Sequence, residues 1–174
     1  DAQTLLTSPE SAPPGGLFSL PATWNSVEDP SQPGTNYPAP GFATFAITVK
    51  LPPTTGKTLG LYLSNADLAY SLYGQRGTSP LPAMVNGVAA TNLEQEIPLY
   101  LPHVITLPES SSNTLELVWH ISSHRHTRGG PRNPPVIGVE RELSDELVGE
   151  RLRDMGLIGV LLVMSLYHFA LFTL

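Results

Sequence analysis

Apolar and polar residues alternate with a period of two along much of residues 41–139, which is typical of half-buried β-strands. Two segments show the alternation best, residues 41–51 and residues 113–122. Their alternating apolar residues are Ala43, Phe45, Ile47, Val49 and Leu51 in the first segment, and Leu115, Leu117, Trp119 and Ile121 in the second.

Shorter extended segments are predicted at residues 59–63, 69–73, 99–101, 104–107 and 135–139, and residues 74–82 are predicted to be a loop. About eight short strands without helical pattern between them favour an antiparallel sandwich or jelly roll, because a parallel sheet needs crossover helices. We therefore predict a mainly β domain over residues 41–139. Its expected core includes Phe45, Ile47, Leu61, Leu117 and Trp119.

The N-terminal residues 1–40 hold eight of the eighteen prolines and no Lys or Arg, which predicts a leader without regular structure. One apolar island interrupts it at residues 17–24 and ends in Trp24. We expect this island to dock on the β domain, and residues 28–40 to form a solvated loop.

The period lengthens after residue 139, where a short helix over residues 140–154 is expected. Ser144 can cap it, and Asp145 and Glu146 would complement the helix dipole in the first turn. Residues 155–174 then contain no charged residue and no proline. Twenty helical residues span roughly 30 Å, the thickness of the bilayer's hydrocarbon core. This pattern predicts a transmembrane helix, with a buried helix of a soluble protein as the alternative.

Composition narrows the possible chemistry. The formal net charge of −6 disfavours a nucleic-acid-binding protein with a broad basic face. The chain has no cysteine, so disulfides, iron–sulfur clusters and thiol catalysis are excluded. No enzyme motif is present, although Glu94 and Glu96 offer a carboxylate pair like that of a glycosidase. We expect a binding domain without catalytic residues or a cofactor, in which these two residues are loop charges.

One polar cluster contrasts with the acidic chain, and no Asp or Glu occurs in residues 117–139 around it. Its members are His120, His124, Arg125, His126, Arg128 and Arg132. Arginine forks would suit a carboxylated or hydroxyl-rich ligand, and Gly129-Gly130 would allow its close approach. Three histidines on one strand face could instead hold a metal ion with His103 or Glu116, and a solvated loop is the third reading. Tyr73 and Tyr100, beside loops, are the aromatic candidates for stacking on a sugar.

Several short motifs resemble the extracytoplasmic sensor domains of a bacterial family, the seven-transmembrane receptors with diverse intracellular signalling modules. The motifs are Pro-Ala-Thr-Trp-Asn at 21–25, Gly-Phe-Ala-Thr-Phe at 41–45, Ala-Tyr-Ser-Leu-Tyr at 69–73, His-Ile-Ser-Ser-His-Arg-His at 120–126, Gly-Gly at 129–130, Ile-Gly at 137–138 and a Tyr-His element at 167–168. The resemblance implies a β-sandwich similar to galactose- and carbohydrate-binding jelly rolls, placed before the first of seven membrane helices. It also implies further membrane helices and a cytoplasmic effector beyond residue 174.

Two functions follow as expectations. The first is a ligand-sensing domain of a receptor in the bacterial inner membrane, with residues 1–154 periplasmic and a small polar or carbohydrate-like ligand. The second is a membrane-anchored β-sandwich that binds a glycan or protein without signalling. The expected partners are the ligand, the membrane and the receptor's remaining helices and effector, and the sequence leaves a homodimer open.

Overall fold

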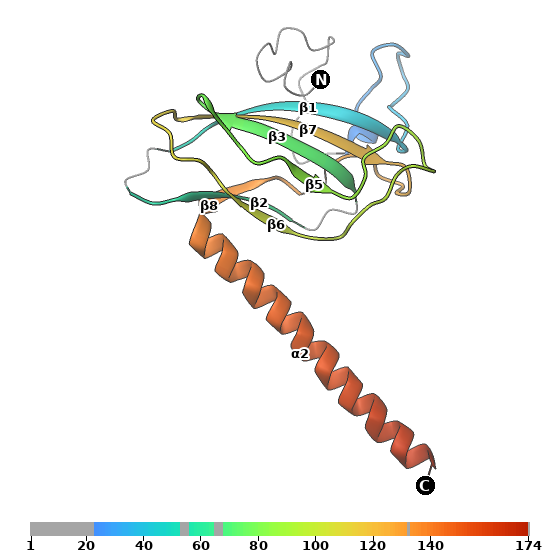
Figure 1. The fold of residues 1–174 in the computed structure, drawn as a ribbon. Coiled ribbons are helices and arrows are strands. Elements are labelled where there is room, and N and C mark those ends of the chain that lie inside the picture. The colour runs from blue at the N-terminus through green and yellow to red at the C-terminus, as the bar shows by residue number, and fades with distance from the viewer. Residues whose placement is uncertain (1–22, 53–55, 65–67, 132, 174) are drawn as a thin grey trace.

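A computed structural model describes residues 23–52, 56–64, 68–131 and 133–173 of the chain (Figure 1). The β domain is followed by one long helix. In chain order the elements are η2 (Trp24–Ser26), β1 (Gly41–Lys50), β2 (Leu59–Leu63), β3 (Ala69–Arg76), β4 (Ser79–Pro80), β5 (Met84–Asn86), β6 (His103–Thr106), β7 (Thr114–Ser123), β8 (Val136–Val139) and α2 (Glu140–Thr173).

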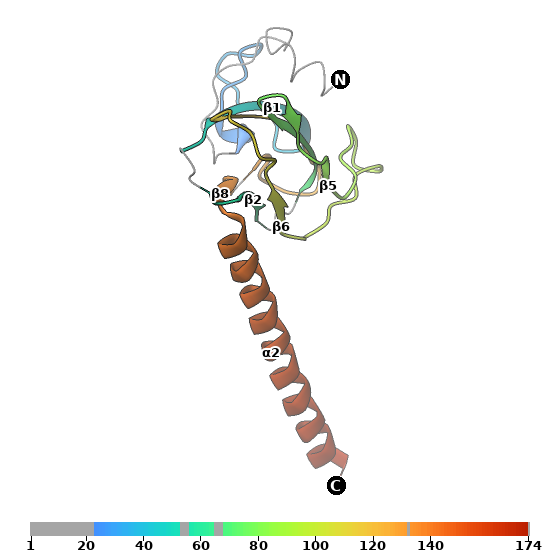
Figure 2. The same ribbon diagram turned by 60° about the vertical axis from the view of Figure 1, so that its left-hand side comes forward.

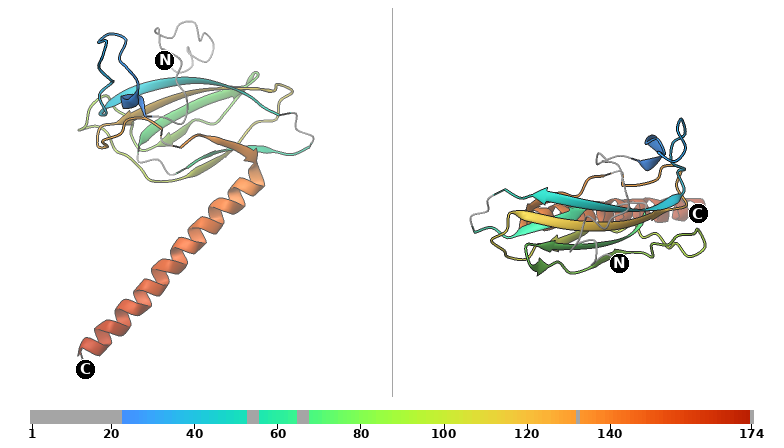
Figure 3. Two further views of the ribbon diagram at one scale, coloured as in Figure 1. Left: turned by 180° about the vertical axis from the view of Figure 1, so that it is seen from behind. Right: turned by 90° about the horizontal axis from the view of Figure 1, so that it is seen from above.

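The strands form two antiparallel sheets that lie as two layers (Figures 2 and 3). The larger sheet has the order β1-β7-β3-β4, with β5 also paired to β3, and the smaller has the order β6-β2-β8. Every strand pair in both sheets is antiparallel. The prediction of a mainly β, antiparallel domain is confirmed.

The alternation of β1 and β7 places their apolar residues between the layers. Phe45 pairs with Trp119 and Ile47 pairs with Leu117 across the two strands. Leu117, Trp119 and Leu61 of β2 are buried, while Phe45 and Ile47 are partly buried against them. All five predicted core residues therefore belong to the core. The residues of β1 are less completely buried than those of β7 and β2.

The third strand is longer than predicted. β3 continues from Tyr73 through Arg76, so the predicted loop at 74–82 is wrong over its first part. Gly74 makes this possible, because a Cβ there would lie 2.7 Å from Cδ2 of Leu117. Arg76 is buried and donates through Nε to Ser112 O (3.0 Å) and through NH1 to Pro108 O (3.1 Å), so its charged group is satisfied.

Residues 99–101, predicted to be extended, belong to no strand of the sheets. They lie in the β5–β6 connection, where Nδ2 of the buried Asn86 donates to Leu99 O at 2.6 Å. A side chain rather than a neighbouring strand therefore satisfies this backbone.

Helix α2 begins at Glu140, immediately after the last residue of β8, and continues without a break to Thr173. Residues 140–154 and 155–173 are therefore parts of one helix. Ser144 lies a turn inside the helix and not at its cap, and its hydroxyl bonds to Oε1 of Glu140 at 3.0 Å. The helix starts earlier because the Glu140 N–H donates to Thr58 O at 3.0 Å, which ties its first turn to the residue just before β2.

Candidate ligand-binding groove

Trp24 anchors the segment before β1 to the body of the domain. Its backbone N–H donates to Gly129 O at 2.8 Å, and its indole Nε1–H lies 3.0 Å from Pro38 O and 3.1 Å from Ala39 O. The side chain is buried. The expected docking of the apolar island is thus seen at Trp24, whereas residues 17–22 lie outside the described residues.

Residues 27–40 form a mostly exposed loop that folds back on itself, as predicted. Glu28 and Asn36 make an antiparallel bridge, and the Tyr37 N–H donates to Val27 O at 3.0 Å. Asp29 closes a turn by accepting from the Ser31 N–H at 2.8 Å. These bonds hold the loop in its folded shape, and the bonds of the Trp24 indole to Pro38 O and Ala39 O tie its end to the body of the domain.

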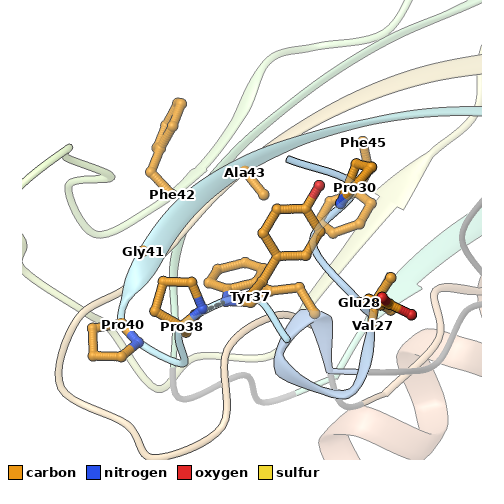
Figure 4. Close-up of a pocket in the computed structure, with 11 residues that line it drawn as sticks. Val27, Glu28, Pro30, Tyr37, Pro38, Pro40, Gly41, Phe42, Ala43 and Phe45 are labelled. Atoms are coloured by element: carbon orange, nitrogen blue, oxygen red, sulfur yellow. Dashed lines mark hydrogen bonds between the residues drawn. The ribbon is translucent and has the colours of Figure 1, made fainter. Parts of the chain in front are cut away.

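A groove of about 490 Å³ lies between this loop and β1 (Figure 4). Its volume is within the range of small-molecule sites. Aromatic rings and prolines dominate the lining, which comprises Trp24, Val27, Glu28, Pro30, Tyr37, Pro38, Pro40, Gly41, Phe42, Ala43 and Phe45. In Figure 4 the Tyr37 ring extends toward Pro30 and Phe45, while Phe42 points away from them.

The groove follows a free sheet edge. Among the described residues, β1 pairs with β7 and with no strand on its other side. Glu28 is the one charged residue of the lining, and its Oε1 accepts the Gly34 N–H at 2.6 Å. Apolar stacking surfaces with a single carboxylate suit an uncharged, hydroxyl-bearing ligand.

A second cavity, of about 310 Å³, lies between the two sheets, with lining residues from both. Its lining is aliphatic side chains and one proline: Ile47, Val49, Leu61, Leu117, Pro135 and Ile137. A cavity that offers no polar side chain has no means of orienting a polar ligand. The groove at residues 24–45 is therefore the better candidate site.

His120 lies on the outer face of the larger sheet, and the structure brings Tyr73 next to it. The ring centroids are 5.9 Å apart at an angle of 70°, and the His120 ring also stacks on Phe42 at 6.3 Å. Nδ1 of His120 is 2.7 Å from Oγ1 of Thr44. Burial lowers the pKa of His120 below its ordinary value, so the imidazole favours its neutral form.

His124 and Arg125 lie beyond the end of β7, where a distant carboxylate contacts them. Glu96 accepts the His124 N–H with both oxygens, at 3.2 and 3.1 Å, and its Oε2 lies 4.0 Å from Nε of Arg125. Only 2% of the Glu96 side chain is exposed, so it is not the loop charge that we expected. Nε2 of His124 donates to Ala90 O at 3.0 Å, so this part of the cluster binds the β5–β6 connection.

The side chain that comes close to the backbone at Gly129 is that of Trp24. A Cβ on Gly129 would lie 2.0 Å from Nε1 of the indole. Arg128 is exposed and His126 is half-buried, and Arg132 lies outside the described residues. Tyr100 is exposed in the β5–β6 connection, whereas Tyr73 and His120 belong to β3 and β7 of the larger sheet. The predicted cluster is therefore divided among separate parts of the surface, and its ligand-binding role stays a prediction.

The three histidines of the metal alternative are not gathered at one point. Within the described ranges, no group of three or more His, Asp or Glu side chains is arranged to hold a metal ion. His120 is engaged by Thr44 and aromatic rings, and the His124 ring by a backbone carbonyl.

The sequence does not predict this groove, because its hydrophobic pattern places the lining residues partly in the leader and partly in the core. Tyr37, Pro30 and Pro38 come from the predicted solvated loop, and Phe45 from the predicted core. The sequence feature that could have indicated the groove is the position of Trp24 and several prolines just before an edge strand.

Helix α2 is the one described helix that is long and apolar enough to cross a membrane, and none of its apolar window is buried in the protein. No family model, no curated protein and no solved structure matches this chain. Its function is therefore argued from the groove and from the way α2 joins the β domain.

Proposed function

We propose that this chain is the extracytoplasmic ligand-binding domain of a bacterial membrane receptor, anchored by α2, and that the groove beside β1 binds a carbohydrate-like ligand. The observation that carries the proposal is the aromatic and proline lining of that groove. The exposed Tyr37 and the partly buried Phe45 offer flat apolar surfaces to the faces of a sugar ring, while the buried Trp24 lines the groove behind them. Glu28 accepts hydrogen bonds from the hydroxyl groups of the sugar.

The two-layer antiparallel fold is compatible with the jelly-roll and galactose-binding type that the sequence resemblance implies. The same resemblance supports a periplasmic location and an effector beyond residue 174. A binding role, rather than catalysis, agrees with the position of the two carboxylates considered above, since Glu96 is buried against His124 while Glu94 is exposed.

The junction of β8 and α2 supports signalling. No connecting residue separates the strand from the helix. Gly60 lets the helix start against β2, because a Cβ there would lie 2.9 Å from Cα of Glu140, and Leu143 is buried near Gly138. A movement of the smaller sheet would therefore turn or tilt α2 instead of being absorbed by a linker.

Ligand binding is tested on the full chain in phospholipid nanodiscs, with the uncharged sugar maltose as the probe for the groove and glucuronate as the charged comparison that would suit the arginine cluster. We expect a saturable change in tryptophan fluorescence, because Trp24 lines the groove. Tyr37→Ala should abolish it, whereas the matched change Tyr100→Ala, at an exposed tyrosine of the β5–β6 connection outside the lining, should leave it intact. If Arg125→Ala and Arg128→Ala abolish the fluorescence change while Tyr37→Ala does not, the ligand binds at the predicted His/Arg cluster and not in the groove. Failure of both sugars to produce a saturable change would contradict the carbohydrate proposal.

Transmission to the helix is tested with a spin label on Leu152→Cys, which is a unique thiol because the chain has no cysteine. Ligand should change the label's spectrum. Two glycines inserted between Val139 and Glu140 should abolish that change and leave binding intact. Binding without any change at residue 152 would favour the second function, a membrane-anchored binding protein without signalling.

A further inference from the structure

We propose that residues 97–101 of the β5–β6 connection contact the lipid bilayer beside α2, giving the β domain a second point of attachment to the membrane. This proposal rests on the proposed anchoring by α2. It concerns the segment Ile97-Pro98-Leu99-Tyr100-Leu101, in which no residue carries a charge.

The side chains of this segment are exposed although they are apolar. The exposed fractions are 57% for Ile97, 43% for Leu99, 53% for Tyr100 and 48% for Leu101. Consecutive exposed apolar residues of this kind mark a surface that meets another protein or a membrane. The neighbouring Val88, which pairs with Ile97, is exposed as well and enlarges the surface.

The backbone of the segment is held in place while its side chains face outward. Ile97 exchanges two hydrogen bonds with Val88, at 2.8 and 3.1 Å, and Leu99 O accepts from Nδ2 of the buried Asn86. Gly87 permits the close pairing, since a Cβ there would lie 1.9 Å from Ile97 O. The exposed side chains therefore belong to a fixed surface of the domain.

The position relative to α2 identifies lipid as the partner. Arg151 of α2 donates through NH2 to Pro102 O at 3.5 Å, so the segment ends against the helix. The charge-free part of α2 begins at Met155, four residues later, which is about 6 Å farther along the helix axis. In Figures 1 and 2 the last part of the β5–β6 connection, which leads into β6, runs along the side of the domain from which α2 leaves. A tyrosine beside leucines at this level matches the composition of a membrane interface.

The test uses the full chain in phosphatidylcholine vesicles, with an environment-sensitive fluorophore on one introduced cysteine at a time. Quenching is measured with lipids that carry a nitroxide either near the headgroup end of the acyl chain, which reports positions 99 and 100, or near its middle, which reports position 163. We expect quenching at Leu99→Cys and Tyr100→Cys comparable to that at Val163→Cys, which reports insertion of α2. Phe42→Cys is the matched control, because it is 45% exposed but lies on β1, at the far side of the domain from α2.

Quenching at Val163→Cys without quenching at Leu99→Cys or Tyr100→Cys would overturn the lipid contact and leave the anchor standing. A blue-shifted emission at Leu99→Cys without quenching would also overturn it, by showing that protein, such as a second copy of the chain, covers the segment. Quenching at Leu99→Cys without quenching at Val163→Cys would support the lipid contact and refute the span. If no position is quenched, both the lipid contact of residues 97–101 and the membrane span of α2 are wrong.

Discussion

At the scale of single residues, Gly129 shows how one position can serve packing where the sequence suggested a ligand. The pair Gly129-Gly130 lies in a stretch rich in histidine and arginine, so a bound ligand was a reasonable explanation for it. The residue that approaches Gly129 is instead Trp24, more than one hundred positions earlier in the chain. Only a contact between distant segments could reveal this.

Gly129→Ala is expected to destabilise the β domain by about 1–3 kcal/mol, the usual effect of overpacking. The new methyl group would overlap Nε1 of Trp24 and Ala39 O, which a Cβ would approach to 2.0 and 2.3 Å. Urea unfolding in detergent, followed by tryptophan fluorescence, measures the effect. Gly149→Ala is the matched control, because no atom lies within 4 Å of its Cβ position, and it should not lower stability. Equal stability of the two variants would contradict the packing role.

Leu117→Ala is expected to cost about 2–5 kcal/mol in the free energy of unfolding, as for other large-to-small changes in a core. Leu117 is buried between the sheets and pairs across the strands with Ile47. The same urea titration applies, with Thr48→Ala on the exposed face of β1 as the control, for which a change within about 0.5 kcal/mol is expected. A loss below about 1 kcal/mol for Leu117→Ala would show that the layers do not pack tightly here.

At the scale of elements, the first turns of α2 are part of the β domain. They contact β2, β6 and β8, and Leu143 is buried. The burial of β2 follows from this arrangement, since its Leu59, Gly60 and Leu61 are all buried where strict alternation would leave every second residue exposed. The sequence of β2, Leu-Gly-Leu-Tyr-Leu, keeps the period-two alternation, so the burial of Gly60 is not visible in the pattern. The helix that covers this strand also starts earlier than a capping residue suggests.

Farther along α2 the polar side chains satisfy their own helix. Nδ1 of His168 bonds to Met164 O at 2.8 Å, and the Ser165 hydroxyl donates to Leu161 O at 2.8 Å. Tyr167 lies edge-on to His168, with ring centroids 5.6 Å apart. These bonds would lower the cost of placing polar groups in lipid, and we predict that Tyr167 and His168 face further membrane helices of the protein.

The contact between α2 and β6 should make stability depend on pH through His103. Burial lowers the pKa of His103, and the positive charge of Arg151 lowers it further. Its buried Nε2 has no hydrogen-bond partner among the described residues, so a proton there would be poorly solvated. Between the ordinary pKa of 6.5 and the lower folded value, the unfolded chain binds more protons. The free energy of unfolding should therefore fall as pH falls through this window.

Unfolding experiments from about pH 7.5 to about pH 5 measure this dependence. His103→Asn should weaken the decline relative to the unchanged chain. Arg151→Gln should raise the pKa of His103, observed directly in an NMR titration of its ring signals, because a repelling charge is removed. A His103 that titrates at or above 6.5 in the folded chain would contradict this prediction.

At the scale of the whole molecule, a two-layer β domain is joined without a linker to a helix about 51 Å long. The apolar part of that helix is exposed over its whole length, a state that water disfavours strongly. We expect the full chain to partition into the detergent phase in a phase-separation assay. A chain truncated after Asp154 should stay in the aqueous phase. A full-length chain that stays monodisperse in water without detergent would contradict the membrane span.

The sequence by itself determined the features that repeat along the chain. Alternation with a period of two is imposed by the strand backbone, so residues such as Phe45, Leu117 and Trp119 could be assigned to the core before any contact was known. The charge-free segment after Asp154 predicted an apolar helix in the same way, from composition and length alone.

Only the tertiary structure decided how segments far apart in the chain meet. It placed Glu96 against His124, wrapped the loop at residues 27–40 over β1 to form the groove, and brought Pro102 beside Arg151. These contacts depend on which strands pair and on the path that the connections between the strands follow. The local pattern of hydrophobic and polar residues does not carry that information. Each of these segments could keep the same local structure in many alternative folds, in which it would contact different parts of the chain.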